Sequence, residues 1–153
     1  MKILLDDLVT DNFTWREMLT STTAIRLGLD NTPESDEIYD NIRLMAETLE
    51  IIRGYYSKPI RVLSCYRSFA VNRAVGGSKT SAHCKALAVD FTVKDTPIIE
   101  VCRWCRDNLK DYDQIIFEFN EWIHYGKAAN PRHQILSAVK EGGKTVYKKG
   151  LEE

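Results

Sequence analysis

Two of the three histidines lie near carboxylates, in a pattern that could hold a metal ion. His83 comes seven residues before Asp90, where a polar loop leads into an apolar, strand-like segment. His124 ends the segment Glu121-Trp122-Ile123-His124. A loop histidine and an aspartate on the following strand can converge on one ion, and a histidine on a neighbouring strand can complete the set. We therefore regard His83, Asp90 and His124 as candidate metal ligands.

The chemistry of such a set is that of a catalytic zinc site. Two imidazoles and one carboxylate leave the fourth position of Zn²⁺ for water, whereas structural sites are closed. Bound zinc lowers the pKa of that water and polarises a carbonyl group, and a nearby glutamate could carry the proton to a leaving amine. Spacing alone leaves two alternatives open, a hydrogen-bonded His–Asp pair without metal and a site for another divalent ion. The chain has no His-Glu-x-x-His segment.

The candidate ligands need a sheet to hold them, and the sequence predicts its strands. Apolar and β-branched residues indicate a strand from Ala88 to Val93, which would carry Asp90. Two further strands, Gln114 to Phe119 and Trp122 to Tyr125, follow one another across a tight Asn120-Glu121 turn. The second of these could be a sheet neighbour of the strand that carries Asp90.

Capping and periodicity signals place the other elements in one α+β domain over residues 1–153, with helices early and antiparallel strands late. The expected elements are a short helix from Thr14, a long helix from Pro33, a strand from Ile60 to Ser64, a helix from about Ser68 to Val75, a polar loop from Ser78 to Lys85, a helix after Thr96-Pro97, and a hairpin with strands Ile135 to Val139 and Thr145 to Tyr147.

Composition excludes several functional classes. The chain has 153 residues, enough for a hydrophobic core, and its 21 basic and 22 acidic residues give a net charge of -1. No basic field favours a nucleic-acid partner or a membrane surface. The N-terminal segment lacks the apolar region of a signal peptide, and no run could span a bilayer. We expect a monomer made in the (host) cytoplasm without membrane insertion, which would need another route to a substrate outside the cell.

The four cysteines do not predict a second metal site. Cys65, Cys84, Cys102 and Cys105 are expected to be reduced in a chain of this kind. Cys102 and Cys105 have the spacing of a redox or zinc pair, but the second pair of a structural zinc site is missing. The simpler interpretation is two small core residues one turn apart on a helix.

Three motifs occur in a fixed order along most of the chain. They are Tyr66-Arg67-Ser68 with Asn72 and Gly76-Gly77-Ser78, then Ser81-x-His83-x-x-Ala86-x-Ala88-x-Asp90, then Glu121-Trp122-Ile123-His124. From Phe13 to about Gly126 the chain thereby resembles the zinc D-Ala-D-Ala carboxypeptidase and L-alanyl-D-glutamate endopeptidase family, especially its small phage-borne members. The central motif of that family is Ser-x-His-x-x-Gly-x-Ala-x-Asp.

The resemblance implies a fold and a set of roles. The fold would be the Hedgehog/DD-peptidase-like domain, in which helices pack on a small, mainly antiparallel sheet that carries a zinc site. Arg67 would hold a carbonyl or carboxylate of the substrate and stabilise the developing oxyanion. Ser81 would bind substrate or shape the loop, and Trp122 would form a pocket wall. The implied Zn²⁺ ligands are His83, Asp90 and His124.

Two glutamates compete for the role of general base. Glu121, three residues before His124, is the first choice. Glu118 is the second, because it would share a face of the sheet with His124 if the intervening turn holds three residues. A further point concerns Ala86, which stands where the family motif has glycine. If that position requires a positive φ angle, alanine must strain or reshape the loop.

The resemblance implies a zinc metallopeptidase that hydrolyses peptide bonds in peptidoglycan stem peptides or crosslinks, as an endolysin does. The bond stays open, because a carboxypeptidase must hold the terminal carboxylate of D-alanine, an L-alanyl-D-glutamate endopeptidase the side carboxylate of D-glutamate, and a crosslink peptidase a branched peptide. The alternative is a non-catalytic zinc-containing binding module, like the Hedgehog signalling domain. The available glutamates favour the enzyme. An incidental cluster would bind no stoichiometric metal.

Overall fold

The structure, a computed structural model, describes residues 2–151 and arranges them as a six-stranded sheet, a two-stranded sheet and the helices around them. The helices are α1 (Trp15–Leu19), α2 (Thr22–Leu27), α3 (Asp36–Tyr56), α4 (Phe69–Ala74), the 3-10 helix η1 (Ala82–Lys85) and α5 (Ile98–Asn108). The strands are β1 (Leu8–Thr10), β2 (Phe13–Thr14), β3 (Ile60–Ser64), β4 (Ala88–Val93), β5 (Tyr112–Glu118), β6 (Trp122–Lys127), β7 (Gln134–Glu141) and β8 (Lys144–Lys149).

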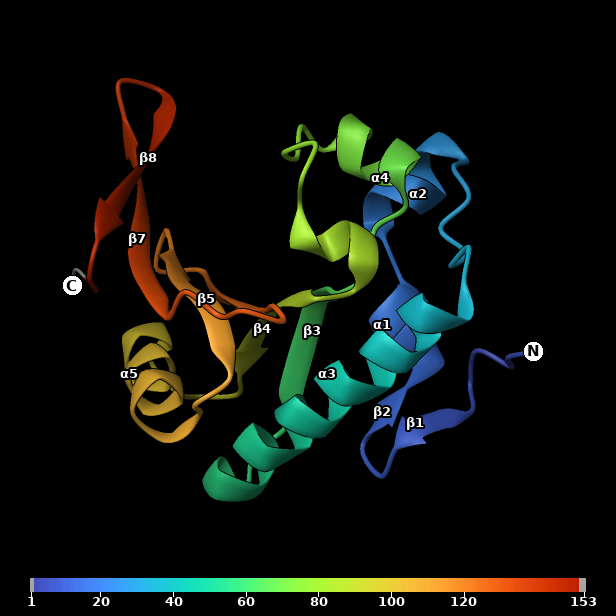
Figure 1. Ribbon diagram of the computed structural model, residues 1–153, viewed down its shortest axis with the longest axis horizontal. Coiled ribbons are helices and arrows are strands. Elements are labelled where there is room, and N and C mark those ends of the chain that lie inside the picture. The colour runs from blue at the N-terminus through green and yellow to red at the C-terminus, as the bar shows by residue number, and fades with distance from the viewer. Residues whose placement is uncertain (1, 152–153) are drawn as a thin grey trace.

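The large sheet has the strand order β3-β4-β6-β5-β7-β8. All neighbours are antiparallel except β5 and β7, which pair in parallel. Figure 1 shows α3 running past β3, the β7–β8 hairpin rising at the opposite end of the sheet, and α2 with α4 above the α3 side. This is the expected α+β fold, with helices on a mainly antiparallel sheet. Within the described residues, no helix is both long and apolar enough to cross a membrane.

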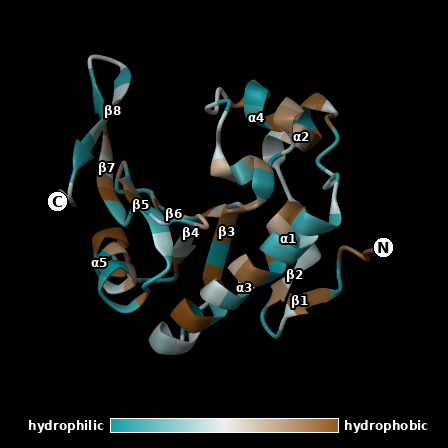
Figure 2. Ribbon diagram, in the orientation of Figure 1, coloured by the Kyte–Doolittle hydropathy of each residue, from teal (hydrophilic) through white to brown (hydrophobic). Residues whose placement is uncertain are grey.

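Alternation along the strands divides the large sheet into two different faces. Odd-numbered residues of β4, β5 and β6 point into the core, because successive side chains of a strand lie on opposite faces. Phe91, Ile115 and Ile123 are fully buried there, together with residues of α3 and α5. Figure 2 shows hydrophobic residues interspersed with polar ones along β3 and α3 and in α5. The other face is left for polar side chains.

The core explains two of the sequence predictions. Cys102 and Cys105 are buried on α5 and are free thiols, as expected for core residues. Thr14 caps α1 in a complete capping box with Glu17, and Phe13 and Met18 beside it are buried.

Several element boundaries differ from the sequence predictions. The long helix begins at Asp36 rather than Pro33, because residues 33–35 enter it as bends and extended backbone. The strand expected to end at Phe119 ends at Glu118, since Phe119 and Asn120 both adopt positive φ in a three-residue turn. The loop expected from Ser78 to Lys85 contains η1. The prediction missed β1, β2 and α2, which are two to six residues long.

The packing of Gly77 generates a testable prediction. A Cβ on Gly77 would overlap Asn72 Oδ1, and Asn72 cannot withdraw freely because it is buried and donates from Nδ2 to the Ser78 carbonyl at 2.8 Å. We expect Gly77→Ala to lower the free energy of unfolding by about 1–3 kcal/mol, the usual cost of overpacking. Urea denaturation measures it.

The matched control is Gly54→Ala on α3. Nothing lies within 4 Å of a Cβ added there, so alanine should raise the free energy of unfolding by about 0.5–1 kcal/mol through its higher helix propensity. Equal effects of the two substitutions would contradict the account of Gly77.

Candidate active site

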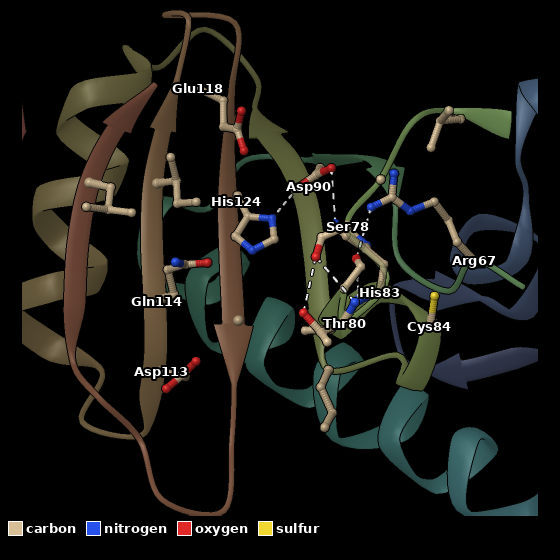
Figure 3. A pocket seen from close by; sticks show the side chains of 18 of the residues that line it. Arg67, Ser78, Thr80, His83, Cys84, Asp90, Asp113, Gln114, Glu118 and His124 are labelled. Atoms are coloured by element: carbon tan, nitrogen blue, oxygen red, sulfur yellow. Dashed lines mark hydrogen bonds and ion pairs between the residues drawn. The ribbon is translucent and has the colours of Figure 1, made fainter. Parts of the chain in front are cut away.

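The pairing of β4 with β6 brings two of the candidate ligands together. Asp90 and His124 are directly opposite one another in the antiparallel ladder, on the face away from the core. His83 reaches the same point from η1, which precedes β4. Figure 3 shows Glu118 and His124 on one side of the cavity, Arg67 on the other, and Asp90 between them. The three residues predicted from spacing thus converge.

The distances suit a shared metal ion. Asp90 offers one carboxylate oxygen to each imidazole: Oδ1 lies 2.9 Å from His124 Nδ1, and Oδ2 lies 3.3 Å from His83 Nε2. One ligand atom from each of the three residues lies within 4.8 Å of the other two. Two nitrogens and one oxygen at this separation match the donor set of a zinc site with an open position.

The tautomer of His83 supports this fit. Its Nδ1 lies 2.7 Å from the Cys65 carbonyl oxygen, which can only accept, so Nδ1 carries the proton. In the neutral ring, Nε2 then presents a lone pair toward the Asp90 carboxylate, and two electron-rich atoms face one another in a buried position. A proton on Nε2 removes this conflict in the metal-free site, and a cation between the two atoms takes its place when metal binds. The carbonyl also fixes the ring as partners of metal-bound histidines do.

Asp90 stays ionised in this environment. Burial acts to raise the pKa of its carboxyl group, but in the metal-free site the charges and hydrogen bonds that His83 and His124 supply when protonated outweigh burial. The net effect holds the pKa of Asp90 well below its usual range. A carboxylate that remains charged while nearly buried is a strong ligand for a cation.

A short local motif positions His83. Ser81 caps η1 by accepting from the His83 backbone amide at 3.3 Å. Ala86 ends η1 with φ 57°, in the left-handed region, where the family motif has glycine. Alanine therefore occupies a backbone conformation that costs it roughly 1–2 kcal/mol relative to the right-handed one. The loop keeps the shape that glycine would give, at the cost of strain.

The structure places the two candidate bases differently. Glu118 lies on the same face of the sheet as His124, because the turn between β5 and β6 holds three residues. It lines the cavity, and it is half-buried. Burial, followed by the charge of Asp90, raises the pKa of Glu118 to about 7, although His124 and Arg67 act in the opposite direction. Glu121 is exposed in the turn and is not among the cavity residues.

Arg67 and Ser81 lie together on the opposite wall from Glu118. Arg67 Nη2 donates to Ser81 Oγ at 3.3 Å, and the Arg67 backbone amide donates to the His83 carbonyl at 3.0 Å. Arg67 Nε is buried without a hydrogen-bond partner. A cationic side chain with unused donors at the cavity wall can bind a carbonyl or carboxylate group.

All these groups line one cavity of about 1120 Å³. Trp122 forms part of its wall, beside Phe119 at 5.7 Å between ring centroids. His133 lies outside the cavity and contacts the Lys110 carbonyl instead. The sequence interpretation missed the part of the wall that comes from β7 and β8, namely Leu136, Lys140, Thr145 and Tyr147. The alternation of polar and apolar residues along the predicted hairpin indicates which side chains share a face, but it does not reveal which strand of the sheet the hairpin pairs with.

The donor set defines the class of protein: two imidazoles and a carboxylate beside a second, protonatable carboxyl group suit a metal-dependent hydrolase. Comparison with known families narrows this class. The family model described as Peptidase M15 matches residues 11–126, a segment that contains the whole donor set. The chain belongs to the Peptidase M15 family and is a metallopeptidase, as the motifs indicated. No curated protein matches its sequence.

The raised pKa of Glu118 predicts a pH-dependent stability. In the unfolded chain the pKa of this carboxyl group is near its ordinary value of 4.5, but in the folded protein burial raises the pKa to about 7. The folded state therefore binds more protons between these values, and the metal-free protein should lose stability as pH rises from about 4.5 to 7. Glu118→Gln removes this loss. Because Glu118 is partly exposed, we expect a difference on the order of 1 kcal/mol.

Urea denaturation of both proteins in metal-free buffer at pH 4.5 and pH 8 measures this difference. Glu118→Gln should gain on the wild type at the higher pH only. A gain that is the same at both values would contradict the raised pKa.

Proposed function

We propose that this metallopeptidase hydrolyses peptide bonds in bacterial peptidoglycan, with Zn²⁺ held by His83, Asp90 and His124. The observation that carries the proposal is the half-buried Glu118, which shares one cavity with the three-residue donor set in a chain of the Peptidase M15 family. Peptidoglycan as the substrate is supported by the resemblance of the motifs to the D-Ala-D-Ala carboxypeptidases and L-alanyl-D-glutamate endopeptidases.

In this proposal Glu118 acts as the general base. Bound zinc supplies Lewis-acid activation of the reacting groups. Glu118 takes a proton from the attacking water and delivers it to the leaving amine, for which a pKa of about 7 is well matched near neutral pH. Arg67 binds the substrate from the opposite wall, and its charge stabilises the developing oxyanion. Ser81 accepts hydrogen bonds from both Arg67 and the His83 backbone amide, and thereby holds the two residues in fixed relative positions.

The biological role that we propose is endolysin-like degradation of the cell wall, after release or delivery of the protein from the cytoplasm. The resemblance to small phage-borne enzymes supports it. Residues 1–153 are proposed to act as one peptidase domain, in which the cavity itself recognises the stem peptide or crosslink. Carboxypeptidase and endopeptidase activities are both compatible with Arg67, because each requires a group that binds a carboxylate.

Mass spectrometry of purified peptidoglycan fragments tests the function. Incubation with the zinc-loaded wild type should release new fragments whose masses identify the bond, whereas His83→Ala should release none because it removes a zinc ligand. Fragments that stay unchanged, although one zinc ion binds per chain, would refute the peptidoglycan proposal. That outcome would favour a non-catalytic binding module.

The role of Glu118 yields a separate prediction. Glu118→Gln should lower kcat by a factor of about 10²–10⁴, the usual contribution of a positioned general base, and should leave the zinc content unchanged. Glu121→Gln is the matched control, since it makes the same change three residues away, outside the cavity, and should alter kcat less than about twofold. A large loss in Glu121→Gln with none in Glu118→Gln would reverse the assignment.

A further inference from the structure

The part of the chain after the family match contributes one wall of the cavity. The match ends at residue 126, whereas β7 and β8 extend to Lys149 and join the sheet beside β5. The parallel pairing of Glu118 with Ala138 places the even-numbered residues of β7 on the same face as Glu118. In Figure 1 this hairpin stands opposite α4, and residues from both line the cavity. The hairpin is therefore a candidate specificity element.

The register of the sheet places particular hairpin residues near the site. Tyr147 pairs with Ala138, which pairs with Glu118, which pairs with Trp122, so these four residues form one row across the face. Ala138 is small and buried, and Tyr147 beyond it is 55% exposed. Lys140 and Thr145 form the next pair along the hairpin on this same face. A substrate that crosses from Glu118 onto β7 and continues toward the tip of the hairpin reaches Lys140.

The side chain of Lys140 is held in place but is not neutralised. Its Nζ donates to Thr145 Oγ1 at 2.8 Å and lies 5.2 Å from the centroid of the Phe119 ring. No carboxylate lies within 4.0 Å of Nζ among residues 2–151. The neighbouring Glu141 instead pairs with Lys148 at 2.7 Å. Lys140 thus presents a positioned positive charge at the cavity wall.

The cavity concentrates positive charge although the chain as a whole does not. Three carboxylates and six cationic side chains line the cavity, whereas acidic residues slightly outnumber basic ones in the whole chain, which has a net charge of -1. Of those three, Asp90 is a proposed metal ligand and Asp113 is paired with a neighbouring arginine. Six cationic residues line the cavity, but Arg132 is paired with Asp113 and Lys127 with Asp111 at 3.1 Å, so the ion pairs of the described residues leave Arg67, Lys79, Lys85 and Lys140. This balance favours a substrate that carries several carboxylates.

We propose that Lys140 binds a free carboxylate of the substrate peptide, several residues away from the bond that is cut. From the strand spacing and the rise per residue, Cα of Lys140 lies roughly 17 Å from Cα of His124. After the reach of the lysine side chain, the remaining distance corresponds to about three or four residues of extended peptide. Arg67 then holds the reacting end and Lys140 the remote end. This inference rests on the proposed peptidase function.

Synthetic stem peptides that differ in one group test this subsite. Three peptides are compared: one with all carboxylates free, one with the D-glutamate carboxylate amidated, and one with the C-terminal carboxylate amidated. Zinc-loaded Lys140→Met should raise KM for the free peptide about threefold to tenfold and leave kcat within about twofold, because it removes binding energy common to ground and transition states. Lys140→Arg should retain most of the affinity.

Amidation identifies which carboxylate Lys140 contacts. In the wild type, amidation of the contacted group should raise KM by the same factor as Lys140→Met, and in Lys140→Met it should have no further effect. The matched control is Lys144→Met, which removes the same charge from the same hairpin at an exposed position outside the cavity. It should change KM less than twofold.

Two outcomes would overturn the subsite without affecting the peptidase proposal. One is an unchanged KM in Lys140→Met, and the other is an effect of Lys140→Met that simply adds to that of every amidation. Binding of labelled peptides to zinc-loaded Glu118→Gln, measured by fluorescence anisotropy, gives the same comparison without turnover. If the wild type neither cleaves nor binds any of the three peptides, the proposed function fails, and the subsite fails with it.

Discussion

The carboxylate of Asp90, shared between two imidazoles, is the interaction on which the rest of the site depends. It lies opposite His124 because β4 and β6 pair in one particular register, and His83 meets it because only two residues separate η1 from β4. A one-residue slip between these strands would turn Asp90 or His124 into the core. The charge of Asp90 tolerates burial only because partners surround it. A cation between these groups also relieves the opposed lone pairs of His83 and Asp90.

The alternation of side chains along the central strands gives the sheet one face for the core and one face for the site. In β4, β5 and β6 the odd-numbered side chains build a core with α3 and α5, and the even-numbered side chains carry Asp90, His124 and Glu118 on the cavity face. The chemistry therefore rests on strands whose positions are fixed by packing on their other face. The loops contribute backbone conformations and close contacts that extended strands do not provide. Ala86 keeps a left-handed backbone that closes η1, and Gly77 allows Asn72 to approach the loop backbone closely.

Much of this arrangement could be predicted from local sequence. The strands Ile60–Ser64 and Ala88–Val93 have the predicted bounds, and the three predicted ligands do converge. Whether Glu118 or Glu121 faces the cavity depended on the length of the turn between β5 and β6. That turn has three residues, two of which adopt positive φ. The parallel pairing of β5 with β7 joins segments far apart in the chain, and no local pattern specifies such a partner. The sequence therefore did not predict that the β7–β8 hairpin, with Lys140, forms a wall of the cavity.

The most direct test of this account is X-ray diffraction from zinc-soaked crystals, recorded on both sides of the zinc absorption edge. The anomalous difference map should show one strong peak per chain, bounded by His83, Asp90 and His124 and facing the cavity that contains Glu118. The absence of a peak at this position, or a peak coordinated by other residues such as Cys102 and Cys105, would contradict the claim that these three side chains form the metal centre of the enzyme.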